Sequence, residues 1–253
     1  MRFLLVLATC TATMAQSGLN VPQAGWMVDA KGGLRPVMGF GGNFWLGAQT
    51  AQGATAAAFE ARGGFVQEGS RVTVLDAAGS PGLRIPESSS TTAVFGFTRW
   101  GVPALVYIPD THELLRVAGN GVERVPGSLE SPLALAEIDG NDALAVVEEK
   151  DGLWMLRVAL LSGAVVSRAA LPGVSAPVSI EADGTLVFER DGAMVMRAAG
   201  GAEREVTVSF HAGAMTPMGD GWIAIFEKDG NRRFALRTTS GRERIDPLPE
   251  EAR

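Results

Sequence analysis

The two histidines are the side chains of this chain with the widest chemical capacity, since imidazole can bind metals or transfer protons near neutral pH. His112 follows Asp110 and Thr111 in a turn-like segment, and His211 follows Phe210 between two apolar segments. Neither has a cysteine, a second histidine or paired carboxylates at the short spacing of zinc or iron sites. We predict turn or surface roles for both, keep them as weak binding candidates, and predict no metal and no cofactor.

Acidic pairs are the other source of chemistry, and they include Asp139 with Asp142 and Glu148 with Glu149. Two carboxylates brought together by folding could hydrolyse a glycosidic bond, although turn and surface positions account for all of them. The segment 139–142 lacks the alternating oxygen ligands and terminal glutamate of a calcium loop. The sequence also has no Gly-x-Ser-x-Gly motif, so we assign no catalytic residue.

Aromatic residues form a third group of weak binding candidates. In the glycine-rich stretch 39–47, freed backbone amides could hold an anion beside Phe44 and Trp45, but the Lys-Ser/Thr ending of a phosphate loop is missing. A glycine-rich connection with Trp45 packed beneath it is the favoured interpretation. Trp100, Trp154 and Trp222 lie at or near the starts of expected strands, where packing between sheets is favoured over ligand contact.

The elements that must position these residues are short strands. Segments of four to eight residues rich in Val, Leu, Ile, Phe and Trp alternate with Asp-Gly, Gly-Gly or Gly-Asn, which indicates tight hairpins. Pairs of Asp-Gly turns recur along the chain, at 139–140 and 151–152, at 183–184 and 191–192, and at 220–221 and 229–230. The recurrence predicts repeated units of four antiparallel strands.

An arginine in the expected fourth strand marks the same repeat. The arginines are about 36 to 49 residues apart, a period typical of propeller blades, and they are Arg35, Arg84, Arg124, Arg168, Arg204 and Arg244. A charged residue suits an outermost strand, because an exposed edge must resist pairing with other chains. Arg35 belongs to the hairpin 25–29 and 34–37, which we interpret as the third and fourth strands of an incomplete unit.

These units predict an all-β fold, a β-propeller of four-stranded antiparallel blades over residues 16–253. Four-stranded units of this length bury their faces against neighbours and close into a ring. Six blades with one reduced is the favoured count, and five blades plus the N-terminal hairpin is the alternative. An irregular β-sandwich or a β array that does not close into a ring is the remaining alternative.

The segment 181–192 carries a family resemblance. Its order Glu181-Ala182-Asp183-Gly184, an apolar strand, and then Asp191-Gly192 resembles the blade motif of exported bacterial propellers of the TolB and WD40-like type. In those proteins a Ser-Pro-Asp-Gly turn precedes the apolar strand, and here Glu-Ala stands in place of Ser-Pro. The resemblance implies a propeller.

The N-terminal segment indicates export. Arg2 precedes an apolar run and a stretch of small residues ending at Ala15, which predicts a signal peptide over residues 1–15 and a mature chain from Gln16. Cys10, the only cysteine, falls inside this segment, and a lipid anchor on Cys10 is the minor alternative. The mature chain would then lack disulfides and would be periplasmic or extracellular.

Composition narrows the range of functions. The net charge is −6 and the basic residues are dispersed, which argues against nucleic-acid binding, and no later segment is long and apolar enough to be a transmembrane helix. We expect an exported, non-enzymatic binding or scaffolding module for a protein or a carbohydrate. The alternative is a carboxylate-dependent hydrolase or lyase with its site on the axial face of the propeller, and a structural repeat protein without a ligand is a third option.

Overall fold

The computed structural model describes residues 21–119, 121–219 and 221–249, and within them every regular element is a β-strand. The all-β prediction is therefore confirmed for this part of the chain. The predicted signal peptide 1–15, with Cys10, and the predicted mature start at Gln16 lie outside the described residues. The described residues contain no helix with the length and hydropathy that a membrane span requires.

The strands group into sheets of three, four and eight, and each eight-stranded sheet consists of two four-stranded units joined by their first strands. We number the units 1 to 6 in chain order. Their strands are, for unit 1, β1 (Gln23–Val28), β2 (Leu34–Phe40) and β3 (Asn43–Leu46); for unit 2, β4 (Ala54–Glu60), β5 (Gly63–Glu68), β6 (Arg71–Asp76) and β7 (Pro81–Ser88); for unit 3, β8 (Val94–Thr98), β9 (Pro103–Ile108), β10 (Glu113–Ala118) and β11 (Gly121–Arg124); for unit 4, β12 (Pro132–Glu137), β13 (Asp142–Glu149), β14 (Gly152–Ala159) and β15 (Val165–Ala170); for unit 5, β16 (Val178–Ile180), β17 (Leu186–Arg190), β18 (Ala193–Arg197) and β19 (Glu203–Thr207); and for unit 6, β20 (Ala212–Gly219), β21 (Trp222–Glu227), β22 (Arg233–Arg237) and β23 (Arg244–Pro247).

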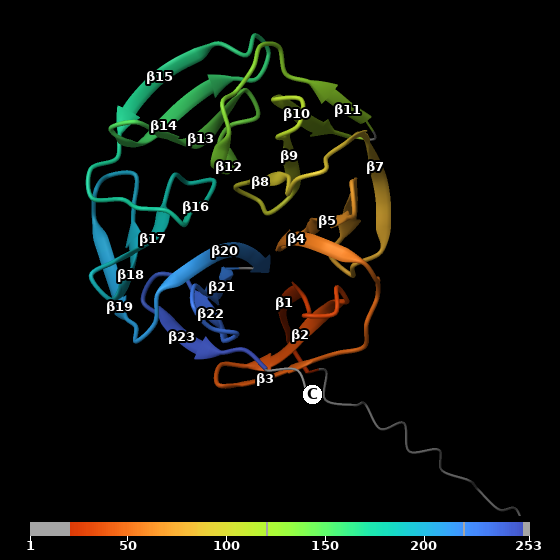
Figure 1. Ribbon diagram of the computed structural model, residues 1–253, viewed down its shortest axis with the longest axis vertical. Coiled ribbons are helices and arrows are strands. Elements are labelled where there is room, and N and C mark those ends of the chain that lie inside the picture. The colour runs from red at the N-terminus through yellow and green to blue at the C-terminus, as the bar shows by residue number, and fades with distance from the viewer. Residues whose placement is uncertain (1–20, 120, 220, 250–253) are drawn as a thin grey trace, which may run out of the picture.

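The units stand around a central axis, with the first strand of each four-stranded unit innermost and the last strand outermost (Figure 1). Within a unit, neighbouring strands are antiparallel. Between units, β12 pairs in parallel with β8, and β20 pairs in parallel with β4 at Met218 and Phe59. This arrangement is a β-propeller, and the predicted fold class is confirmed.

The Asp-Gly signals make the hairpins that the sequence indicated. Arg190 pairs with Ala193, so Asp191 and Gly192 are the two central residues of the β17–β18 turn. Their φ angles are 51° and 75°. A two-residue turn of type I′ requires positive φ at both positions, and Asp-Gly is one of the pairs that tolerate this.

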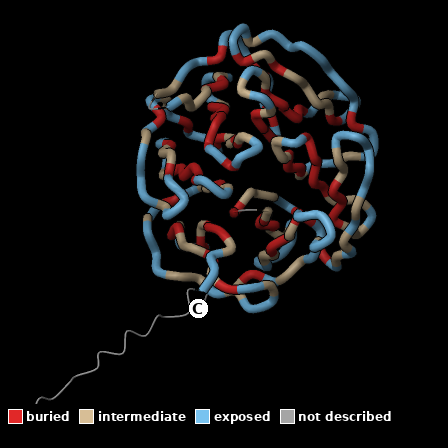
Figure 2. Tube along the Cα trace, turned by 180° about the vertical axis from the view of Figure 1, so that it is seen from behind, coloured by how far each residue is buried: buried red, intermediate tan, exposed pale blue. Residues whose placement is uncertain are grey.

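Burial between units explains why many strands are apolar on both faces. The trace in Figure 2 is buried mainly along the inner and middle strands. Leu105 and Tyr107 of unit 3 pack with Ala143 and Val147 of unit 4 in one cluster, and Val187 of unit 5 packs with strands of unit 6 in another. Every residue of β9 is buried. Each unit is thus covered by its neighbours, as a propeller requires.

Unit 1 differs from the prediction. The hairpin 25–29 and 34–37 was interpreted as the third and fourth strands of a unit, but β3 follows it and is the outer strand of the three. The glycine-rich stretch is therefore the β2–β3 hairpin with its turn at Gly41 and Gly42, and not a connection into the next unit. Arg35 lies in the middle strand, where it pairs with Asp29 at 2.7 Å. The other five arginines of the repeat lie in outermost strands, as predicted.

Units 1 and 6 meet at close range where the ring closes. A Cβ atom on Gly25 would lie 1.9 Å from the backbone oxygen of Met218, so β1 approaches β20 more closely than any side chain at this position allows. The guanidinium of Arg233 in β22 donates a hydrogen bond of 3.1 Å to the backbone oxygen of Val28. These contacts join segments at opposite ends of the described chain.

Candidate functional site

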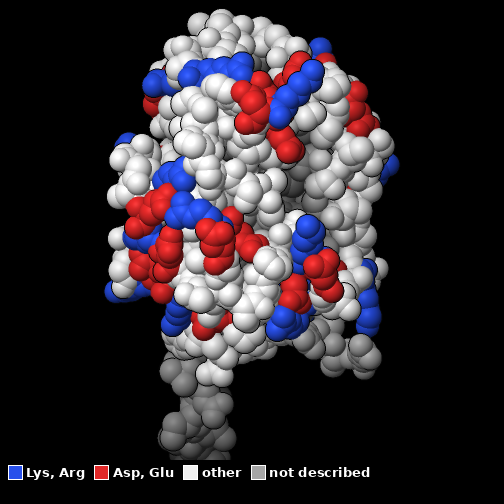
Figure 3. Space-filling view, turned by 60° about the vertical axis from the view of Figure 1, so that its left-hand side comes forward, with Lys and Arg blue, Asp and Glu red and all other residues white. Residues whose placement is uncertain are grey.

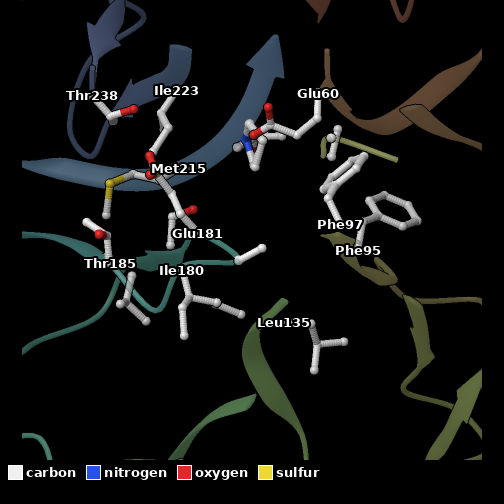
Figure 4. A pocket seen from close by; sticks show the side chains of 18 of the residues that line it. Glu60, Phe95, Phe97, Leu135, Ile180, Glu181, Thr185, Met215, Ile223 and Thr238 are labelled. Atoms are coloured by element: carbon white, nitrogen blue, oxygen red, sulfur yellow. The ribbon is translucent and has the colours of Figure 1, made fainter. Parts of the chain in front are cut away.

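A cavity of about 680 Å³ occupies the ring centre and is the principal candidate site. The first strands β4, β8, β12, β16 and β20 supply most of its wall (Figure 4). Large apolar side chains on this wall include Phe95, Phe97, Leu133, Leu135, Ile180, Met215 and Ile223. Small residues alternate with them, and alanines of β4 and β12 leave the space open. The volume is in the range that small ligands occupy.

Glu181 is the most unusual polar residue of this cavity. It follows β16 directly and lies half-buried on the same side of the pocket as Thr185, Met215 and Thr238 (Figure 4). The backbone around it is fixed, because Glu181 N donates to Thr185 O at 2.9 Å and Gly184 N donates to Glu181 O at 2.9 Å. The β16–β17 turn therefore holds this carboxylate at the cavity.

The surroundings of Glu181 disfavour its charged form. Burial raises the pKa of the carboxyl above its ordinary value, and the neighbouring Asp183 raises it further. A hydrogen bond from Thr238 and the charge of Arg204 act in the opposite direction, but burial is the largest of these effects. Among the described residues, Glu181 forms no ion pair.

The arginines that line the cavity are engaged elsewhere. Arg204 forms an ion pair with Glu243 and donates a hydrogen bond of 3.2 Å to the backbone oxygen of Thr238. The guanidinium carbon of Arg99 lies 4.4 Å from the centre of the Trp100 ring. Glu60 lies across the pocket from Glu181, beside Phe95 and Phe97 (Figure 4). The lining thus holds three carboxylates and two arginines.

Of the aromatic candidates, the structure brings Phe44 and Trp222 together. Their rings meet edge to face with centroids 5.4 Å apart, at the junction of units 1 and 6. Trp222 is only 6% exposed, and the guanidiniums of Arg237 and Arg244 lie over its ring at 5.2 and 5.4 Å. Trp222 also lines the axial cavity. Most of the Trp222 surface is therefore in packing contacts, which was the favoured interpretation.

Trp45 does not pack beneath a connection, contrary to the expectation. It lies in the outer strand β3 and is 46% exposed. Successive side chains of a strand point to opposite faces, so Phe44 turns toward Trp222 while Trp45 turns away from it. Sequence analysis placed this stretch in a loop and therefore missed the alternation.

Trp100 and Trp154 lie apart from each other and from Trp45. Trp100 is in the β8–β9 turn and is 61% exposed. Trp154 is half-buried in β14, where its indole donates a hydrogen bond of 3.1 Å to Asp151 and the guanidinium of Arg168 lies 4.0 Å above its ring. The tryptophans do not form a common surface.

His112 contacts a buried tyrosine. Its Nδ1 lies 3.1 Å from the hydroxyl of Tyr107, and that hydroxyl accepts a hydrogen bond of 3.1 Å from Ser131 N. His112 has a φ of 55°, and it belongs to the turn between β9 and β10. The turn role predicted for His112 agrees with this geometry.

His211 has a partner that sequence analysis did not identify. Its Nδ1 lies 2.7 Å from Glu189 Oε1, and the second oxygen of Glu189 accepts a hydrogen bond of 2.6 Å from Ala212 N. The pair borders a second cavity of about 600 Å³ whose charged lining also includes Arg190, Asp191, Lys228 and Asp229. Its lining thus holds three carboxylates beside Arg190, Lys228 and His211, so acidic and basic side chains are equal in number.

The acidic pairs singled out in the sequence lie outside the axial cavity. Asp139 and Asp142 both contact Arg157, at 3.3 and 2.5 Å, and Glu149 contacts Arg168 at 2.5 Å. The cavity carboxylates are instead Glu60, Glu181 and Asp183. One feature of the sequence could have singled out Glu181, because it stands where serine is usual in the blade motif. The described residues contain no group of three or more His, Cys, Asp or Glu that could hold a metal ion.

Comparisons with known proteins give similarity of low degree. No family model matches the chain, and no curated protein matches it. A streptogramin B lyase structure is 12% identical over 93% of this chain and 86% of the other, with a TM-score of 0.49. Virginiamycin B lyase from Staphylococcus aureus is 12% identical over 92% of this chain and 85% of the other, with a TM-score of 0.49. The Neurospora crassa Pan2 WD40 domain is 12% identical over 91% of this chain and 80% of the other, with a TM-score of 0.46. At these values the likenesses carry no argument about function, and the propeller assignment rests on the sheet arrangement.

Proposed function

We propose that this protein is an exported, non-enzymatic binding module that holds a ligand in its axial cavity. The observation that carries the proposal is the cavity itself, with about 680 Å³ of space inside a wall of aliphatic and phenylalanine side chains. Charged and hydroxyl side chains interrupt this wall, among them Glu181, Thr185 and Thr238, and an apolar cavity with polar groups at defined places is typical of ligand sites. The sheets packed around the axis hold the walls of this space in place.

The chemistry of the wall favours an apolar ligand. A protein and a carbohydrate were the two expected partner classes. The labelled polar side chains Glu181, Thr185 and Thr238 lie on one side of the pocket (Figure 4). Carbohydrate hydroxyls that face Leu133 and Leu135 would have no partner there, and an unpaired buried polar group is costly. Apolar surface, from a small molecule or from a side chain of a protein partner, gains free energy by leaving water.

A neutral apolar fluorophore tests this proposal. Leu133 lines the cavity and is still 36% exposed, so Leu133→Trp extends into open space, whereas Leu161 is 93% exposed at the β14–β15 turn. Pyrene should bind the native protein and the control variant Leu161→Trp alike, and Leu133→Trp should weaken binding about tenfold or more by excluding it sterically. Equal pyrene affinity of the two variants would place the binding elsewhere and contradict the proposal.

Export is part of the proposal and is supported by the N-terminal sequence and by the resemblance of 181–192 to exported propellers. Expression of the full chain in a Gram-negative host, followed by fractionation and N-terminal sequencing, should give a periplasmic or secreted protein starting at Gln16. A chain with an intact Met1 in the cytoplasm would contradict export. Labelled fatty acid on the native chain but not on Cys10→Ser would indicate the lipid anchor instead.

A carboxylate-dependent hydrolase or lyase is the second candidate, and one observation favours it. Burial raises the pKa of Glu181, and a general acid needs such a shift to hold its proton near neutral pH. A panel of glycoside and polyuronide substrates, tested with native protein, Glu181→Gln and Glu60→Gln, examines this function. Turnover that both variants abolish would support it, and absence of turnover across the panel would argue against it.

A further inference from the structure

We propose that the axial cavity selects ligands with an apolar body and one ammonium group, and that Glu181 receives the ammonium. This inference rests on the proposed function, because it names the ligand chemistry of the same site. It follows from the charges around the cavity, the position of Glu181 and the side chains beside it.

The charge balance of the lining favours a cation. Its acidic side chains are Glu60, Glu181 and Asp183, and its basic ones are Arg99 and Arg204. Arg204 is already neutralised by Glu243, and Arg99 lies on the Trp100 ring. Glu60 also has an interaction of its own, so the charge left beside the β16–β17 turn is that of Glu181 and Asp183, which a cationic ligand would complement.

Glu181 is the carboxylate best placed to bind that cation. Its backbone is fixed by two hydrogen bonds within the β16–β17 turn, and its side chain is half-buried without an ion-pair partner among the described residues. Ionising such a carboxylate carries a desolvation cost that an ammonium at hydrogen-bond distance would offset. Thr238 lines the same side of the pocket as this carboxylate, and its hydroxyl donates a hydrogen bond of 3.4 Å to Gly221 O (Figure 4).

The side chains beside Glu181 suit the body of an amphiphilic amine. Ile180, Met215 and Ile223 lie next to it on the wall, and Leu135 and Phe97 lie farther across the pocket (Figure 4). A ligand with its nitrogen at Glu181 therefore has apolar surface available for the rest of its length. An anionic ligand in the same place would meet both Glu181 and Asp183, which opposes binding.

Three probes of equal chain length and different head group test the inference: n-octylamine, 1-octanol and octanoate, measured by isothermal titration calorimetry at pH 7. We expect the native protein to bind octylamine about tenfold or more tightly than octanol, because a hydrogen bond between charged groups is stronger than one between neutral groups. Octanoate should bind most weakly. Glu181→Gln should reduce the affinity for octylamine to that for octanol and leave octanol unchanged.

Glu203→Gln is the matched control, since Glu203 lies on the outer strand of the same unit. It should keep the full preference for the amine. Equal affinities of native protein for octylamine and octanol, or a preference that survives Glu181→Gln, would overturn the inference while leaving the cavity a binding site. Failure of all three probes to bind would instead contradict the proposed function itself.

A second measurement reports directly on Glu181. Near the raised pKa of this group, octylamine should displace its proton, so the binding enthalpy of native protein should vary with the ionisation enthalpy of the buffer. The neighbouring charges that shape this titration are Asp183 and Arg204. Octanol should show no such dependence, and Glu181→Gln should remove it for the amine. A buffer dependence that persists in Glu181→Gln would assign the proton to another group.

Discussion

Glu181 and Glu203 belong to the same four-stranded unit and have opposite electrostatic surroundings. Glu203, in the outer strand β19, contacts Arg190 at 2.5 Å and Arg197 at 2.7 Å. Hydrogen bonds from these two arginines lower the pKa of Glu203 to about 2. Glu181, at the inner end of the unit, has no ion pair among the described residues, and burial raises its pKa.

The difference shows that one four-stranded unit places its two glutamates in opposite electrostatic surroundings. Outer strands carry acidic and basic side chains next to one another, as the side of the molecule in Figure 3 shows, and such charges protect exposed edges at little cost. At the axis, burial desolvates the Glu181 carboxylate and no ion pair within the described part of the chain offsets this, which lowers stability. Residues that reduce stability in this way are concentrated at functional sites.

The largest expected effect comes from removing the framework that carries both glutamates. Phe188 is fully buried in β17 and packs in the cluster between units 4 and 5. Phe188→Ala should lower the free energy of unfolding by about 3–5 kcal/mol, because it removes a buried ring and leaves a cavity. Urea unfolding followed by tryptophan fluorescence measures this. A loss below about 1 kcal/mol would mean that unit 5 is not held by this core, and the comparison of its two edges would fail.

The second largest expected effect is the pH-dependent loss of stability caused by Glu181, the glutamate at the inner end of unit 5. Because the folded-state pKa of Glu181 is raised, its destabilisation is absent below the ordinary pKa of 4.5 and grows as pH rises through the folded-state value. Glu181→Gln should therefore be more stable than native protein at pH 7 to 8, and the difference should disappear near pH 4. Melting temperatures of both proteins from pH 4 to 8 test this. A variant that is less stable at pH 8 would show that the carboxylate is satisfied in the fold.

The smallest expected effect is that of Glu203 in the outer strand, whose charge adds to stability where that of Glu181 reduces it. The depressed pKa of Glu203 contributes stability that is present above pH 4.5 and lost as pH falls toward about 2. Glu203→Gln should be slightly less stable than native protein at pH 7, and added salt should shrink the difference because exposed ion pairs are screened. Melting temperatures at low and high ionic strength measure it. Equal salt responses of Glu203→Gln and Glu181→Gln would remove the distinction between the two edges.

The fold was predictable because its signals are local. Asp191 and Gly192 form their turn from their own backbone preferences, and arginines such as Arg84 and Arg124 mark outer strands by a simple period. The outer strand β3 was missed because its four residues follow a glycine pair that suggests a loop. The local order of turns and strands thus gave most of the unit boundaries.

The site was less predictable because its contacts join distant segments. Glu181 reaches the cavity because β16 ends at the axis, where Thr238 of unit 6 also lines the pocket, and no local pattern encodes that meeting. The pairing of Phe44 with Trp222 depends on ring closure, and the pairing of His211 with Glu189 spans 22 residues across a unit boundary. The aromatic and histidine candidates were chosen by residue type, and residue type does not predict which distant residues will be in contact.

The junction of units 1 and 6 has a consequence for the order of folding. The hydrogen bond from Arg233 to Val28 spans 205 residues, and the close approach of Gly25 to Met218 is nearly as long-range. Contacts of such separation form late, because the entropy of closing a long loop opposes them until the intervening chain is structured. During synthesis, units 1 and 2 cannot make these contacts until β20 has been made, so the axial chamber forms only when the chain is nearly complete. A ligand held in it would therefore report that the ring has closed, and would favour the closed ring over open intermediates.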